Sequence, residues 1–221
     1  MQVTGEMAGE ARADEAAAVA TPAPRVGVLL SGGASRRMGR PKALLVDQAG
    51  RLFLERLVGT LRAGGCDAVV VVAGCHVAEI AARLPPEALL VRNAAWERGQ
   101  FSSVRCGLEA ALCLRPRRIA FTLIDQPLIV PADVRAVLRA EVEAAPLAIA
   151  AHGGEPGHPL SLSPALARAI ASDERSTSLR EALERHADAQ VFVEGSAGCV
   201  RGANTPEELV ALGLSAALLD G

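Results

Sequence analysis

Short apolar runs alternate along the chain with stretches in which apolar residues return every three or four positions. The first run covers residues 26–30 and ends in Ser-Gly-Gly, and helical spacing follows at 53–63. The next run, 67–73, is almost wholly valine and alanine. Near-continuous runs of this kind are typical of strands buried on both faces of a parallel sheet. The pattern therefore predicts alternating strands and helices.

The alternation continues to the end of the chain. It predicts further strands at 88–92, 118–124, 147–151, 159–162 and 190–193, and helices at about 76–83, 102–114, 165–171 and 179–186, with others opening at Pro131 and Thr205. Repeated strand-then-helix units with short connections favour an α/β fold of three layers, α/β/α, with a mostly parallel sheet. Neither an internal repeat nor a segment with the composition of an inter-domain linker divides residues 25–221, so we expect one domain there.

The N-terminal segment, residues 1–24, differs from the rest. Alanines alternate with acidic residues, bulky side chains are sparse, and the segment closes in Thr-Pro-Ala-Pro. It has neither the basic start nor the continuous apolar stretch of a secretory signal. We expect a disordered tail.

Composition narrows the class of partner. The 221 residues carry a net charge of -2, and aromatic residues are 2% with no tyrosine. This gives no electrostatic footprint for nucleic acid or an anionic membrane, and no stacking platform for single strands. The five cysteines form no C-x-x-C pair, which favours reduced thiols in a cytoplasm. We expect a cytoplasmic protein without nucleic-acid or membrane partners.

Ligands of open parallel sheets bind where strands end, and the loop after the first strand is rich in candidate groups. Its glycines permit close backbone approach and can form an anion nest. Its cations suit a triphosphate, and its spacing fits neither a Walker A loop nor G-x-G-x-x-G. A plain solvated basic turn is the alternative. The glycines are Gly32, Gly33 and Gly39, and the cations are Arg36, Arg37, Arg40 and Lys42.

An acidic residue, Asp125, directly follows the strand expected at 118–124. A carboxylate at this edge faces whatever the first loop binds. Opposite a triphosphate it would act chiefly through a divalent cation, because Mg²⁺ prefers hard oxygen ligands and can be bound by a carboxylate and by phosphates at the same time. The alternative is that Asp125 caps the following turn.

Three further segments carry polar groups that also have structural explanations. Ser102 and Ser103 stand where a helix N-cap is expected. His158, in an expected loop over 153–160, is either a ligand contact or a loop hydrogen-bonder. Thr205 fits a helix N-cap, with Pro206 at the first helical position.

Together these motifs resemble the MobA-like nucleotidyltransferases, over about residues 25–212. The first loop is similar to the family signature LxxGxSxRMGxxK, and N-x-x-W…G-x-x-S-S and G-x-x-G-H-P are similar to the molybdopterin cytidylyltransferase branch. Gly202 departs from the C-terminal pattern, which has Asp or Asn there. The signature positions in register are Leu30, Gly33, Ser35, Arg37, Met38, Gly39 and Lys42.

The resemblance implies a Rossmann-like nucleotidyltransferase fold of GT-A type. It implies that Lys42 and Arg37 neutralise the triphosphate, that Asp125 holds Mg²⁺, and that Gly157, His158 and Asn204 contact the acceptor. It implies nucleotide contacts at Leu30, Ser31, Gly32, Gly33, Ser35, Arg36, Met38, Gly39, Ser102 and Ser103.

We therefore expect transfer of a nucleoside monophosphate from a nucleoside triphosphate, with CTP favoured, to a phosphorylated acceptor, with molybdopterin as the favoured acceptor, and release of pyrophosphate. A molybdoenzyme maturation protein is a further expected partner. An acceptor phosphate is already ionised at pH 7 and needs no general base, which agrees with the expectation that no histidine stands at a strand end before His152. The alternatives are transfer to a sugar or isoprenoid-precursor phosphate, and a nucleotide-binding regulatory protein without turnover.

Overall fold

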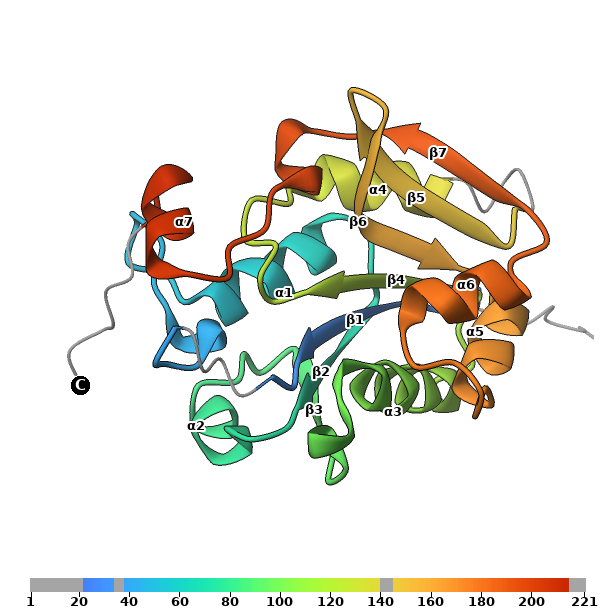
Figure 1. Ribbon diagram of the computed structural model, residues 1–221, viewed down its shortest axis with the longest axis horizontal. Helices are drawn as coiled ribbons and strands as arrows, with labels where there is room; N and C mark the ends of the chain where they lie inside the picture. Colours follow the sequence, from blue (N-terminus) through green and yellow to red (C-terminus); the bar gives the residue numbers. More distant parts are fainter. Residues whose placement is uncertain (1–21, 34–37, 140–144, 215–221) are drawn as a thin grey trace, which may run out of the picture.

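The computed structural model describes residues 22–33, 38–139 and 145–214, which form a seven-stranded sheet with helices on both faces (Figure 1). The strand order is β3-β2-β1-β4-β6-β5-β7. The strands are β1 (Arg25–Ser31), β2 (Ala68–Ala73), β3 (Ala88–Arg92), β4 (Arg118–Leu123), β5 (Leu147–His152), β6 (Glu155–Leu162) and β7 (Gln190–Glu194). The tail expected at 1–24 lies outside the described residues up to position 21, and its disorder stays a prediction.

The helices complete three layers. Those described are α1 (Phe53–Ala63), α2 (Val77–Ala82), α3 (Gln100–Cys113), α4 (Pro131–Arg139), α5 (Pro164–Ala171), α6 (Leu179–His186) and α7 (Pro206–Ala211), with 3₁₀ turns η1 (Lys42–Leu44), η2 (Trp96–Arg98) and η3 (Ala197–Val200). Helices α1 and α4 cover one face of the sheet, and α3, α5 and α6 cover the other (Figure 1). The predicted fold class is confirmed.

The valine run of β2 shows why this sheet forms. Val69 and Val71 point into the core beneath α1, while Val70 and Val72 point into the core beneath α3. Alternate side chains of a strand face opposite sides, so a strand covered on both faces needs apolar residues at every position. The four parallel pairs are β1 with β2, β1 with β4, β2 with β3 and β5 with β7.

Helix α3 lies unusually close to the sheet. A Cβ at Gly107 would sit 2.8 Å from side-chain atoms of both Val28 and Val72. The glycine therefore permits the close approach, which brings the start of α3 to the carboxyl ends of β1 and β2. That start is Gln100, with Gly99 as N-cap at a φ of 100°. The expected capping by Ser102 or Ser103 is wrong, because both lie inside the first turns. The expected cap at Thr205 is correct, since its hydroxyl accepts from the Glu208 N–H.

The strand β6 differs most from expectation. Residues 153–160 are not a loop, because β5 and β6 form a hairpin across Gly153 and Gly154, whose φ values are 59° and 83°. Two consecutive residues with positive φ match a tight hairpin turn, which glycine adopts without strain. Strand β6 then pairs antiparallel with both β4 and β5. Gly157 and His158 therefore lie in a strand. Within the described residues, no helix is long and apolar enough to cross a membrane.

Candidate active site

A cavity of about 500 Å³ opens at the carboxyl ends of β1 and β4. The chain runs from β1 outward through β2 and β3 and then returns to place β4 on the other side of β1. Such a reversal leaves a crevice between neighbouring strand ends, which is the usual ligand site of open parallel sheets. Predicted residues that line it are Leu30, Ser31, Gly32, Gly33, Met38, Lys42, Ser103, Asp125 and Asn204.

Other predicted residues fall elsewhere. Ser35, Arg36 and Arg37 lie outside the described residues, so their roles stay predictions. Gly39 is described but is not part of the cavity lining. Ser102 is not part of the lining either, and its hydroxyl donates to the carbonyl oxygens of Ala95 at 3.0 Å and Gly99 at 2.8 Å.

Lys42 and Asp125 meet in the cavity although 83 residues separate them. The Lys42 Nζ atom lies 3.5 Å from Asp125 Oδ2 and 2.9 Å from Asn204 Oδ1. These side chains come from the loop after β1, the end of β4 and the approach to α7. The Asp125 and Lys42 side chains are 22% and 13% exposed, so the attraction between their charges is only partly screened by water. The site thus brings the Lys42 cation and the Asp125 anion close to each other.

The carboxylate of Asp125 retains binding capacity. Its Oδ1 atom is buried and has no hydrogen-bond partner within the described residues. No backbone N–H of these residues donates to the carboxylate, so the turn-cap alternative has no support. A buried carboxylate oxygen without a partner is costly, and a cation would satisfy it. The described residues hold no cluster of three His, Cys, Asp or Glu. This donor set suits Mg²⁺, which commonly takes one or two carboxylates and completes its shell with phosphates and water.

The serine side of the cavity is organised by Asn93, which the sequence analysis did not select as a site residue. Its side chain is buried, and Nδ2 donates to Ser102 Oγ at 2.8 Å and to Ser103 Oγ at 2.9 Å. Its Oδ1 accepts from the Ala95 N–H. The glycine at position 32 rests on this cluster, because a Cβ there would lie 2.5 Å from Ser103 Oγ. The first Asn of N-x-x-W was the available signal.

Further lining residues were also missed. They include His76, Trp96, Glu97 and Gln100. His76 stands three residues after β2, and its Nδ1 lies 2.7 Å from Glu79 Oε2. The expectation that no histidine stands at a strand end before His152 is therefore wrong. The valine run 67–73 followed by Gly-Cys-His was the signal, since this loop ends at the same sheet edge as the first.

A second cavity, of about 940 Å³, adjoins the first, and Gln100 and Leu123 line both. Two predicted acceptor contacts, Gly157 and His158, line the second cavity, whereas Asn204 lines the first. The predicted acceptor set is thus divided. Burial lowers the pKa of His158 from 6.5 to about 4, although the Asp125 charge acts in the opposite direction. The imidazole is neutral at pH 7.

Two glycines near these cavities have packing explanations. A Cβ at Gly157 would lie 2.1 Å from the Cys199 carbonyl oxygen, so η3 requires glycine there whatever binds. A Cβ at Gly202 would lie 3.1 Å from Gln126 Nε2 and 3.3 Å from the Asp125 carbonyl oxygen. The Gln126 amide therefore occupies the space next to Gly202. The Ala203 N–H also donates to the Asp125 carbonyl, which docks this segment on the site.

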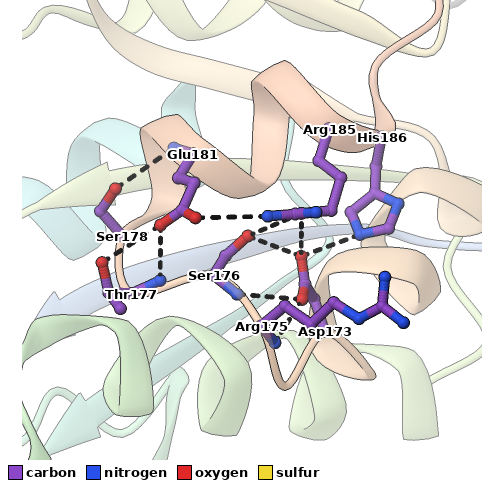
Figure 2. A network of polar contacts seen from close by, with 8 residues as sticks. All are labelled: Asp173, Arg175, Ser176, Thr177, Ser178, Glu181, Arg185 and His186. Carbon is purple, nitrogen blue, oxygen red and sulfur yellow. Dashed lines mark hydrogen bonds and ion pairs between the residues drawn. The ribbon is translucent and has the colours of Figure 1, made fainter.

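The α5–α6 turn, which forms a wall of the second cavity, is fixed by the buried Asp173 (Figure 2). Its carboxylate accepts from the Ser176 hydroxyl at 2.7 Å and lies 2.9 Å from His186 Nε2. The Ser176 hydroxyl leads the contacts that hold the pKa of Asp173 well below its usual range, and burial acts against them. Arg185 adds an ion pair at 3.5 Å.

Comparison with known proteins identifies a family for most of the chain. A family model described as MobA-like NTP transferase domain matches residues 27–191. "Nicotine blue oxidoreductase" of Paenarthrobacter nicotinovorans is 41% identical over 104 residues, which span 46% of this chain and about half (49%) of that relative. "Probable molybdenum cofactor guanylyltransferase" of Rhodopirellula baltica is 29% identical over 198 residues, covering 86% of this chain and 92% of the relative.

Solved structures show the fold. Rv0371c from Mycobacterium tuberculosis H37Rv superposes with a TM-score of 0.71 at 24% identity, covering 87% of this chain and 98% of that one. The same protein has also been solved as a complex with manganese, with a TM-score of 0.67 at 22% identity over 86% and 97% of the two chains. At these identities the likeness establishes the arrangement of the sheet and helices.

Proposed function

The chain belongs to the MobA-like NTP transferase family, and from that premise we propose that it transfers a nucleoside monophosphate from a nucleoside triphosphate to a phosphorylated acceptor and releases pyrophosphate. The observation that carries this proposal is the pair of Lys42 and Asp125, 3.5 Å apart in a cavity at the β1–β4 crevice, with one buried Asp125 oxygen that has no hydrogen-bond partner among the described residues. Phosphoryl-type transfer needs positioned charge more than covalent chemistry, and this pair supplies it.

The residues have separate tasks in this mechanism. Lys42 neutralises phosphate oxygens of the bound triphosphate, and Arg37 joins it from the same loop. Asn204 orients the Lys42 ammonium through its 2.9 Å hydrogen bond. Asp125 would hold Mg²⁺ through its carboxylate, and the ion would offset the charge that develops on pyrophosphate. An oxygen of the acceptor phosphate attacks the α-phosphorus in line. Because the acceptor phosphate is already ionised, no side chain needs to remove a proton.

We further propose that the nucleotide lies over the loop after β1 and the start of α3, and that the acceptor enters from the second cavity. Because the two cavities adjoin at Gln100 and Leu123, an acceptor phosphate can reach the nucleotide from that side. His158 is neutral, so it adds no charge to an anionic acceptor and can serve as a hydrogen-bonding group. The glycine at 157 contributes only by allowing the strand to pack.

The identities that we propose for the donor nucleotide and the acceptor rest on the resemblance to the family motifs. The segments N-x-x-W and G-x-x-G-H-P favour CTP as donor and molybdopterin as acceptor. GTP is the second candidate donor, because the Rhodopirellula baltica relative is named a guanylyltransferase. A sugar or isoprenoid-precursor phosphate is the other acceptor class. Mg²⁺ is the proposed ion, and the manganese complex of the mycobacterial neighbour supports a divalent cation.

The catalytic unit, the cellular compartment and the partners that we propose follow from the sequence. Residues 25–221 form the catalytic unit, and the reaction takes place in the cytoplasm, which suits the five free cysteines. Its partners are small molecules, with neither nucleic acid nor membrane, and a molybdoenzyme maturation protein receives the product.

Pyrophosphate release tests the function. The protein is incubated with CTP, GTP, ATP or UTP, with and without molybdopterin, in Mg²⁺ and in chelator. We expect release that needs acceptor, one preferred triphosphate and the divalent ion, and that Asp125→Asn abolishes. Release with a sugar phosphate instead would replace the acceptor. Tight nucleotide binding without turnover on any acceptor class would favour the regulatory alternative.

A further inference from the structure

The segment that joins Lys42 to α1 is folded around a buried carboxylate, that of Asp47. Asp47 is 4% exposed, and its Oδ1 accepts the backbone N–H groups of Ala49 at 2.9 Å and Arg51 at 3.0 Å. The Phe53 N–H donates to the Leu45 carbonyl at 2.8 Å, which closes the segment into an arm, residues 42–53. Since η1 begins at Lys42, the arm determines where the base of the Lys42 side chain lies.

The loop that carries Asp125 contacts the same arm through one guanidinium group. Arg56, on α1, donates from Nε to the carbonyl oxygen of the buried Pro127 at 2.7 Å. From Nη1 it donates to Asp47 Oδ2 at 3.1 Å. Pro127 lies two residues beyond Asp125. Arg56 therefore joins the arm that bears Lys42 to the loop that bears Asp125.

We propose that Arg56 is a positioning residue that fixes the separation of Lys42 and Asp125, and so determines how well the site binds a triphosphate. The proposal rests on the proposed function, because it concerns the same two residues. A guanidinium suits this task, since its donors have a fixed planar geometry and remain charged. Small displacements of charged groups in a site of this kind have large effects on binding and rate.

The chain offers a matched control in Arg51. Its Nη2 lies 3.2 Å from the same Asp47 oxygen, but its side chain is 60% exposed, and within the described residues it makes no hydrogen bond or ion pair with the 125–127 loop. Arg51→Gln and Arg56→Gln each remove one cation from Asp47. Only Arg56→Gln also releases Pro127.

The experiment compares the binding of CTP and CMP by calorimetry in Mg²⁺, with GTP and GMP as a second pair, for the parent protein and both variants. We expect Arg56→Gln to weaken triphosphate binding about tenfold and monophosphate binding little. Arg51→Gln should leave both affinities near the parent values. In a Lys42→Ala background, Arg56→Gln should cause no further loss, because effects that act through one group are not additive.

The outcomes distinguish the proposed tether, which is the link that Arg56 makes between the arm and the loop that bears Asp125, from a general structural role of this side chain. Equal losses in the two arginine variants, or an Arg56→Gln loss that persists undiminished without Lys42, would overturn the proposal. If Arg56→Gln does not fold, Arg56→Lys replaces it, because it keeps a charge beside Asp47 while one ammonium nitrogen substitutes for two fixed donors; an unchanged preference for triphosphate in that variant would also overturn the tether. A parent protein that binds triphosphate no better than monophosphate would overturn the proposed function and the tether together.

Discussion

The two cavities are neighbours, yet they are assembled in different ways. In the first, Lys42 contacts Asp125 and Asn204, which lie 83 and 162 positions away in sequence. In the wall of the second, Asp173 contacts Ser176 and His186, only 3 and 13 positions away (Figure 2). The first site therefore depends on contacts between distant parts of the chain, whereas the α5–α6 turn in the wall of the second is organised locally.

The chemistry of the two regions differs in the same way. The first cavity brings a cation, and a carboxylate oxygen without a hydrogen-bond partner in the described part of the chain, to the strand ends, where charge can act on a ligand. The second has walls rich in apolar side chains, among them Phe101, Phe121 and Leu183, and its histidine is neutral. The first cavity is therefore suited to phosphates, and the second to the body of an acceptor. This difference supports the proposal that the acceptor enters from the second cavity.

Sequence predicted the first region better because parallel strands place successive loops at one edge. Once 26–30 and 118–124 are strands, Lys42 and Asp125 must end near each other. The same reasoning had no means to place β6, because an antiparallel strand reverses which loop meets which edge. The hairpin glycines at 153 and 154 carried that information, but they were interpreted as part of a binding loop.

Side-chain details were also beyond the pattern. That Gly32 lies on Ser103, and that Asn93 joins both serines, depends on the close approach of α3 to the sheet, which no periodicity specifies. Glycine was a poor guide for the same reason. A glycine required by packing, such as Gly157, has the same letter as one that leaves room for a ligand.

Asp125→Asn should have the largest effect and should leave the second region intact. The amide is isosteric but neutral, so it keeps the strand-end geometry and loses the charge that a hard cation needs. Each 1.4 kcal/mol of barrier is about tenfold in rate, and we expect turnover to fall about a hundredfold or more. Melting temperature and pyrophosphate release are measured on the same variant. A destabilised protein with normal turnover would contradict the metal-ligand assignment.

Lys42→Ala should weaken the binding of triphosphate more than that of monophosphate. A partly buried charge-assisted contact contributes about 1.5–3 kcal/mol, or roughly ten- to a hundredfold in affinity. The monophosphate is the internal control, because it retains the base and sugar contacts. Calorimetric titration with CTP and CMP gives both values, and equal losses for the two ligands would place Lys42 away from the β- and γ-phosphates.

His158 should make the stability of the second region depend on pH. Its folded pKa of about 4 lies below the ordinary 6.5, because burial disfavours the imidazolium. Between these values the unfolded chain binds a proton that the folded chain does not, so the free energy of unfolding falls as pH falls from 6.5 to 4. At about 1.4 kcal/mol per pKa unit, the contribution over this range is about 3 kcal/mol.

Urea unfolding at pH 7, 5.5 and 4.5 measures this dependence. His158→Gln should flatten the profile over that window, and His152→Gln, a change at an exposed histidine, should not. The same pH dependence in His158→Gln as in the parent protein would show that this imidazole is not the group responsible.

Gly33→Ala tests whether the glycine at position 33 leaves room for a bound triphosphate. No atom of the described structure lies within 4 Å of a Cβ at Gly33, which lines the first cavity, so the described residues leave room for a methyl group. A triphosphate held against that backbone would meet it. We expect CTP affinity to fall about tenfold, comparable to the 1–3 kcal/mol of a steric insertion, with the melting temperature nearly unchanged.

Gly157→Ala is the matched change in the second region, and its effect should be of the other kind. The new Cβ would lie 2.1 Å from the Cys199 carbonyl oxygen, so η3 must move and the melting temperature should fall by about 2 °C or more. The folded protein should still bind CTP normally, because this methyl group faces backbone rather than the first cavity. If Gly33→Ala instead lost stability, or Gly157→Ala lost CTP affinity at full stability, the assignment of one glycine to ligand and the other to packing would be reversed.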